Sequence, residues 1–367
     1  MGELFNFSEF DKAERESMDV HKIDFNKFLS QLSGKSRSDS KPSHCLYCEE
    51  ENNKFCNSHS VPASFLRNIA VDGKVYTTNV ILDLPILETE KGVNNSGTFQ
   101  IICRKCDSEI FKEYENVRNY DETPSNKMLA QIAMKNHLRN IGKRRFEISL
   151  YKNMIEAITK KADKRYVQMY FSEMLSVSRI DLLEYVRDFK RAKKAIEKGW
   201  DNEYYLFFYH KLEYVVPIAF QGEVCINFDF CGNAINEVYV KSKSYKLHSL
   251  HISIFPMASY SIIMMFINKN SNRLRQFYKQ FNSLELHDKL SAINYIIFSL
   301  SEDVFMSKSI HDKFIEDEAL KKIAGLTTIQ FADSPIKDHD LLKTTFDLSD
   351  RHNIQNFLLM CHENAYE

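Results

Sequence analysis

The sequence predicts an α+β protein in which a cysteine-rich module, a helical segment and an antiparallel sheet with C-terminal helices follow one another. Two Cys-x-x-Cys pairs lie in the first third of the chain, at positions 45/48 and 103/106. Apolar residues recur at helical spacing from residue 124 to about 200, and the period changes to two between residues 203 and 268. Only 10 Gly and 7 Pro interrupt the 367 residues, which favours long regular elements.

The composition is that of an ordinary folded protein. Apolar residues make up 44% and charged residues 27% of the chain, which excludes wholesale disorder. The 49 basic and 50 acidic residues give a net charge of -1, so any signal for a nucleic-acid partner must be local. The first residues lack the features of a signal peptide, and the longest apolar stretch, residues 261–268, is too short to span a bilayer. We therefore expect a cytoplasmic protein without a membrane partner.

Residues 1–43 are expected to form a helical lead-in and a linker. Apolar residues recur at helical spacing up to Leu32, which predicts a helix that ends near residue 33. Residues 34–43 are small, polar and charged, a composition typical of a linker.

Residues 44–120 form the predicted cysteine-rich module. In a reducing compartment, thiols in paired Cys-x-x-Cys spacing indicate metal ligands rather than disulfides. Two such pairs can close a tetrahedral zinc site, here made by Cys45, Cys48, Cys103 and Cys106. A second allocation is a local site of three cysteines and a histidine, made by Cys45, Cys48, Cys56 and His59, which leaves the later pair without a role.

Residues 121–202 form a basic helical segment. One helix is expected to end at Gly142 and a second to run from Ser178 to Gly199. Between Lys127 and Lys198 there are 18 basic and 8 acidic residues, a local charge of about +10 that suggests either a nucleic-acid surface or a solvated helix face. Nine basic residues are candidates for contacts with substrate phosphates, and two of them lie between the cysteines of the second pair. They are Arg104, Lys105, Lys143, Arg144, Arg145, Lys190, Arg191, Lys193 and Lys194.

Residues 203–367 are expected to begin with an antiparallel meander. The alternating pattern predicts strands over residues 204–209, 214–220, 224–230, 238–240 and 250–255, with turns at Gln221-Gly222 and Gly232-Asn233. From residue 272 the chain is expected to be helical, as in residues 287–300. No motif assigns a function to this region.

The cysteine-rich module resembles the HNH endonucleases of the His-Me finger superfamily, in their zinc-stapled form. A first cysteine pair, the run Ser58-His59-Ser60-Val61-Pro62 and a second pair that opens a helix occur in the order typical of that family, over about 70 residues. The resemblance implies a ββα-metal, treble-clef-like module whose zinc is structural. Three departures are visible: the 43 residues between His59 and Cys103 are more than the family usually has, residues 99–102 lack the central Asn, and Asp107 replaces a terminal His or Asn.

The resemblance also implies site roles and a function. His59 would be the general base, with Asn95 as the residue that orients it, and a helix over residues 106–115 would carry Asp107 and Glu115. Together with His59, these two carboxylates would hold a catalytic Mg²⁺ or Mn²⁺. The implied function is metal-dependent cleavage of nucleic acid, with DNA favoured over RNA, and bacterial defence against phage or plasmids by analogy.

Other interpretations of the same residues remain open. His59 could instead hydrogen-bond a buried carbonyl, Asp107 could cap a helix, and Glu115 could lie on a solvated face. The module would then be a non-catalytic zinc module that binds nucleic acid or protein. A third alternative is a nuclease subunit that acts only in a larger complex, with a partner or a further copy bound through the C-terminal region.

Overall fold

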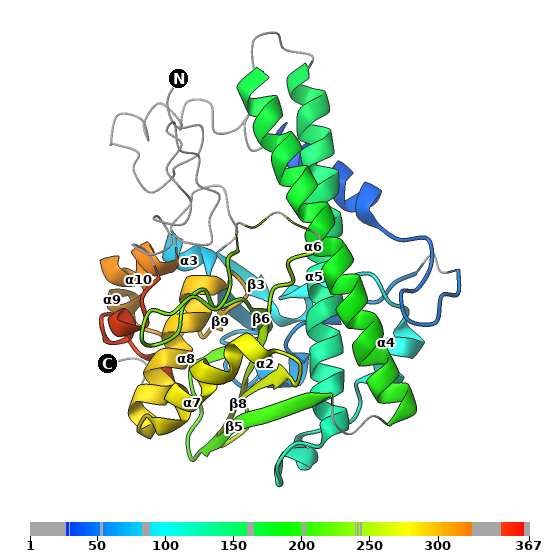
Figure 1. Ribbon diagram of the computed structural model, residues 1–367. Helices are drawn as coiled ribbons and strands as arrows, with labels where there is room; N and C mark the ends of the chain where they lie inside the picture. The colour runs from blue at the N-terminus through cyan, green and yellow to red at the C-terminus, as the bar shows by residue number, and fades with distance from the viewer. Residues whose placement is uncertain are drawn as a thin grey trace.

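The computed structural model describes residues 27–28, 30–51, 54–82, 89–159, 165–199, 203–238, 240, 242, 244–324 and 346–362. It is a mixed α+β structure built around a seven-stranded antiparallel sheet (Figure 1). Two long helices, α5 (Asn126–Thr159) and α6 (Arg165–Lys198), pack along each other on one face of the sheet. The C-terminal helices cover the other face. No helix in this described part of the chain is both long and apolar enough to cross a bilayer.

The order of the strands in the sheet is β3-β2-β9-β6-β7-β8-β5. In that order the strands are Glu90–Gly92, Lys74–Thr77, Phe305–Met306, Ile218–Val224, Leu250–Pro256, Ser261–Asn268 and Tyr204–Leu212. Two of them, β2 and β3, come from the long segment between His59 and Cys103. This segment therefore extends the sheet through β9, and the sheet joins the first third of the chain to the last.

Both faces of the central strands are buried, which explains why their sequences are almost continuously apolar. Along β8, Ile263, Met265 and Ile267 belong to the core beneath the C-terminal helices. The alternate residues Ile262, Met264 and Phe266 belong to the core beneath α5 and α6. The period of two is present, but both of its phases are apolar.

Several predicted strand boundaries are wrong. Gln221-Gly222 lies inside β6 rather than at a turn, and residues 225–230 form no named strand. Of the predicted strand over residues 238–240, the described residues 238 and 240 lie outside the named strands. A Cβ at Gly222 would lie 2.9 Å from the Phe220 ring, so the glycine makes room for packing within the strand. The turn at Gly232 is present, with φ of 77° at that residue.

The predicted linker over residues 34–43 is also wrong in most of its length, because the helix continues to residue 40. Polar contacts with α5 hold it there: Asn153 donates hydrogen bonds to Ser36 at 3.0 Å and to Asp39 at 3.1 Å. Gly142 does not end a helix either. It lies within α5, where a Cβ would approach the Phe99 side chain to 3.4 Å, so the glycine permits close packing.

The C-terminal half contains the predicted helices. They are α7 (Arg275–Ser283), α8 (Leu286–Leu300), α9 (Asp312–Ile315) and α10 (Glu318–Ala324). The smaller elements of the N-terminal half are α2 (Ala63–Leu66), α3 (Asn79–Leu82) and the 3-10 helices η1 (Val93–Asn95) and η2 (Val117–Tyr120). All of them lie in the segments that surround the cysteine pairs.

Candidate functional site

Two short strands and one helix form the centre of the cysteine-rich module. Strand β1 (Ser58–His59) pairs antiparallel with β4 (Thr98–Phe99), so that His59 lies opposite Thr98. Helix α4 (Arg104–Ile110) is the next element along the chain, after residues 100–103. Gly97 precedes β4 with φ of 62°, and a Cβ there would lie 2.4 Å from the Ser60 hydroxyl, so only glycine fits this turn.

The two cysteine pairs converge on one point. The sulfur atoms of Cys45, Cys48, Cys103 and Cys106 all lie within 4.8 Å of one another, close enough to hold a metal ion such as zinc. The backbone N–H of Cys103 donates to the Cys45 sulfur at 3.3 Å, and the N–H of Cys106 donates to the Cys103 sulfur at 3.5 Å. These N–H groups would stabilise thiolates, and Cys103 rather than Asp107 is the N-cap of α4.

The alternative site of three cysteines and a histidine is not formed. Cys56 donates a hydrogen bond to the Ile102 carbonyl at 3.5 Å instead, and His59 belongs to no metal-holding group among the described residues. Burial raises the pKa of the Cys56 thiol to about 12, which keeps it protonated at neutral pH.

His59 is half-buried and is held by a backbone carbonyl. Its Nε2 lies 3.1 Å from the carbonyl oxygen of Val93, the first residue of η1. Because a carbonyl can only accept, Nε2 carries the proton and Nδ1 keeps its lone pair. Burial lowers the pKa of His59 below its ordinary value, so the imidazole is neutral at pH 7. Asn95 ends the same 3-10 helix with an exposed side chain, and the residue of this helix that holds the His59 ring is Val93.

Asp107 and Glu115 do converge on one cation, but that cation is a lysine. The Nζ of Lys135, from α5, lies 2.8 Å from Asp107 and 3.3 Å from Glu115, and it is 3.8 Å from the centroid of the Phe111 ring. Ser58 donates a further hydrogen bond to Asp107 at 2.6 Å. Burial alone would raise the pKa of Asp107, but the Lys135 ammonium and the Ser58 hydroxyl bring it below its ordinary value.

The predicted helix over residues 106–115 is too long. Helix α4 ends at Ile110, and Glu115 reaches Lys135 from a turn in which its N–H donates to the Phe111 carbonyl at 3.1 Å. The predicted metal set of His59, Asp107 and Glu115 is therefore not assembled as a cluster of ligands in the described residues.

Most of the predicted phosphate contacts on α5 and α6 face the protein. Five of the nine make intramolecular contacts: Lys143 with Glu302 at 2.9 Å, Arg144 with Asp181 at 3.0 Å, Arg145 with the Ser40 carbonyl at 2.9 Å, Arg191 with Glu203 at 3.3 Å, and Lys193 with the Tyr47 carbonyl at 2.5 Å. The other four, Arg104, Lys105, Lys190 and Lys194, are exposed. Much of the local positive charge therefore contributes to folding rather than to an open surface.

The sequence patterns did not identify Lys135 or two groups of ligand-type side chains as parts of candidate sites. Lys135 is 1% exposed, although it follows the apolar run Ile132-Ala133-Met134. Its position on the apolar face of a predicted helix was the only signal for a buried ammonium. Two further groups of ligand-type side chains are present in the described chain: a buried one of His137, Glu223 and His251, and a more exposed one of His287, Asp288 and His352.

Comparisons with protein-family models, with curated proteins and with solved structures gave no match.

Proposed function

We propose that the protein is an HNH-type endonuclease in which His59 is the general base. The observation that carries this proposal is the geometry of His59. It lies on the first strand of a ββα arrangement, between the two cysteine pairs in the sequence, and the Val93 carbonyl fixes its tautomer. A neutral imidazole with a free Nδ1 can take a proton from the water that attacks a phosphodiester.

The cysteine cluster supports this role as a structural zinc centre of treble-clef type. One pair lies before β1 and the other opens α4, so a bound zinc would fix the strand that carries His59 relative to the helix. A bound zinc would add to the apolar contacts that the module already makes in the core beneath α5 and α6.

Binding of the catalytic divalent ion would depend on the position of Lys135. Asp107 and Glu115 already share its ammonium, so Mg²⁺ or Mn²⁺ would have to displace Lys135 to reach both carboxylates. An ion bound in this way would stabilise the charge that develops on the phosphate and the leaving oxygen.

The decisive experiment is a plasmid-nicking assay on wild type, His59→Ala and His44→Ala, with Mg²⁺ and with Mn²⁺. His44 is an exposed histidine beside the first cysteine and serves as the matched control. Loss of the base should lower the cleavage rate by about 10²–10⁴-fold while zinc content and nucleic-acid binding stay unchanged. Equal rates for His59→Ala and His44→Ala would reject His59 as the base.

A non-catalytic zinc module is the second candidate, and the ion pair of Asp107 with Lys135 favours it. That pair satisfies the carboxylate without any added metal ion. If the zinc-loaded wild type binds DNA or RNA but cleaves neither with any divalent ion, this candidate replaces the nuclease. A role in defence against phage or plasmids would extend either candidate, and phage plating on cells that carry wild type or His59→Ala tests it.

A further inference from the structure

A second group of ligand-type side chains lies between α5 and the sheet, on the face opposite the C-terminal helices. Glu223 of β6 and His251 of β7 are direct partners across the two strands, so their side chains leave the sheet on the same face. His137 of α5, the helix that packs on this face, contacts them, and its Nδ1 lies 2.8 Å from the Glu223 carboxylate. One ligand atom from each of the three lies within 4.8 Å of the other two.

The group is buried and borders a small cavity. The side chains of His137 and Glu223 are 4% and 3% exposed, and His251 is 2% exposed. The cavity beside them has a volume of about 30 Å³ and is lined by all three residues. This volume has room for about one water molecule.

Neighbouring amides orient the three side chains. Asn140 donates to the Glu223 carboxylate at 2.8 Å, and the Asn136 amide lies 3.2 Å from Nδ1 of His251. Asn136 is held in turn by Gln221 at 3.1 Å. With Nδ1 of His251 engaged in this way, Nε2 is the nitrogen left for a ligand. Outer hydrogen bonds that hold an imidazole and a carboxylate are characteristic of metal sites.

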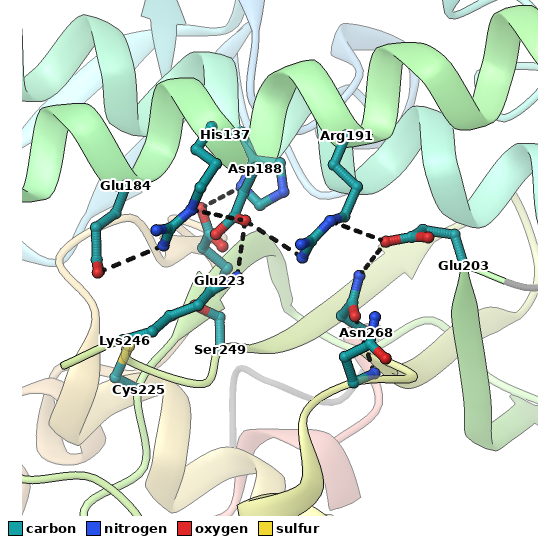
Figure 2. A network of polar contacts seen from close by, with 12 residues as sticks. His137, Glu184, Asp188, Arg191, Glu203, Glu223, Cys225, Lys246, Ser249 and Asn268 are labelled. Carbon is teal, nitrogen blue, oxygen red and sulfur yellow. Dashed lines mark hydrogen bonds and ion pairs between the residues drawn. The ribbon is translucent and has the colours of Figure 1, made fainter. Parts of the chain in front are cut away.

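Ion pairs on α6 enclose the cavity without using these three residues. Asp188 pairs with Lys246 at 2.9 Å and with Arg191 at 3.6 Å, and Arg191 pairs with Glu203 at 3.3 Å (Figure 2). Asp188 is therefore already neutralised by basic residues. The direct polar partners of Glu223 are instead His137 and Asn140, and His251 lies opposite it on β7.

A buried ion pair between His137 and Glu223 would account for two of the three residues. It gives no reason for a second imidazole, placed directly across the strands from the same carboxylate. The ring of His251 stacks on Phe266 with 4.7 Å between centroids, which fixes its plane beside Glu223.

From this geometry we infer that His137, Glu223 and His251 form a binding site for one divalent transition-metal ion. Two imidazoles and one carboxylate are the donor set that Zn²⁺ or Fe²⁺ takes in open sites, and the cavity provides the fourth position for a water. The site is separate from the cysteine cluster and does not depend on nuclease activity.

The test is the metal stoichiometry of the full-length protein, with Co²⁺ as the probe. Purified protein saturated with Co²⁺ and freed of excess ion should hold two equivalents per chain by elemental analysis. One equivalent should show the intense thiolate-to-cobalt charge-transfer absorption of the cysteine cluster. The other should show only the weaker bands of nitrogen and oxygen ligands.

Variants assign the second equivalent. Glu223→Gln and His251→Gln should each lose it and keep the thiolate absorption, whereas Ser249→Ala, which alters the wall of the same cavity, should keep both. His352→Ala removes the more exposed group and should also keep both equivalents. This surface variant is informative even if the buried variants fail to fold.

A single cobalt equivalent in folded wild type, bound only by thiolates, would overturn the inference. So would a second equivalent that disappears in His352→Ala, because the ion would then belong to the surface. Neither readout depends on cleavage, so this inference and the proposed nuclease activity can fail separately.

Discussion

Lys135 is a buried side chain of α5 that contacts the cysteine-rich module through two carboxylates at once. Its buried ammonium is shared by Asp107, which is 24% exposed, and Glu115, which is 35% exposed. Removing one partner of such a group leaves charge without compensation in a site with little water. The same contact decides whether a divalent ion can reach the two carboxylates.

Lys135→Met should therefore lower the free energy of unfolding by about 3 kcal/mol, at the lower end for buried ion pairs because Glu115 is partly exposed. Mg²⁺ should restore part of the loss by binding the freed carboxylates. Denaturant unfolding with and without Mg²⁺ measures both effects. Lys127→Met, which removes a more exposed pair with Glu113, is the control and should cost less than about 1 kcal/mol. Equal stability of the two variants would contradict this account of Lys135.

In the proposed nuclease, the pKa of His59 would determine the pH dependence of cleavage. Burial lowers the pKa of its imidazole below 6.5, although the Val93 carbonyl opposes this effect. A base must be deprotonated to act, so kcat/KM should rise with pH through a pKa below 6.5 and stay level above it. Asn95→Ala should leave this profile unchanged, because the contact with His59 comes from the Val93 backbone. A rising limb centred above pH 7 would show that another group is the base.

At the scale of elements, α5 contributes a side chain to two of the polar groups described above, the Asp107–Glu115 pair and the group of His137, Glu223 and His251. It presents Lys135 to the module and His137 to the sheet, and further along it Lys143 and Arg144 form ion pairs. These polar contacts add to the apolar packing that α5 makes in the core. Some basic side chains of α5 and α6 make such internal contacts, and others are exposed to solvent.

Charge reversal should separate these two sets. Glutamate at Arg104, Lys105, Lys190 and Lys194 should weaken nucleic-acid binding and reduce its salt dependence by about one unit for each phosphate that is no longer neutralised. Lys143→Glu should instead lower stability, because it places a carboxylate beside Glu302. Binding measured over a series of salt concentrations, together with thermal melting, distinguishes the outcomes. An unchanged salt slope would identify the exposed set as merely solvated.

The cysteine cluster should couple metal binding to the folding of β1, β4 and α4. Cys45→Ser should lose the ion of the cluster and the order of this unit, because ligation is part of its folding energy. Cys56→Ser should retain the ion, since that thiol bonds the Ile102 carbonyl. Elemental analysis and hydrogen exchange of the two variants test this. Full metal content in Cys45→Ser would refute the assignment of the ligands.

At the scale of the whole molecule, the sheet makes the N-terminal and C-terminal parts interdependent. Strand β2 pairs with β9 from residues 305–306. Phe65 of α2 packs on Phe255 of β7 with 4.8 Å between ring centroids, and Asn68 donates to the Pro256 carbonyl at 2.8 Å. The predicted segments before residue 120 and after residue 202 therefore share one sheet, and all three segments contribute to the core beneath α5 and α6.

Calorimetry of the metal-loaded protein should consequently show a single cooperative unfolding transition. Phe305→Ala, in the strand that joins β2 to β6, should lower the midpoint of that transition without splitting it, at a cost of about 3–5 kcal/mol. Leu183→Ala, at an exposed apolar position on α6, is the control and should change the midpoint little. Two well-separated transitions in the wild type would show that the parts fold independently.

The sequence by itself determined the α+β class, the spacing of the two cysteine pairs and a helix over residues 287–300, which the structure extends by one residue, because these depend on local periodicity and short-range chemistry. It also identified Cys45, Cys48, Cys103 and Cys106 as one group, since each pair is close in sequence and needs another pair to complete a site. Only the tertiary structure decided that the apparent linker is helical, that Gly222 lies within a strand, and that Asp107 meets Lys135. Each of these outcomes depends on contact with a segment that is distant in the sequence. Asn153 bonds Ser36, β7 pairs with β6, and Lys135 of α5 meets Asp107 of α4. The grouping of His137, Glu223 and His251 has the same origin, because strand pairing and helix packing bring together residues that are 86 and 28 positions apart.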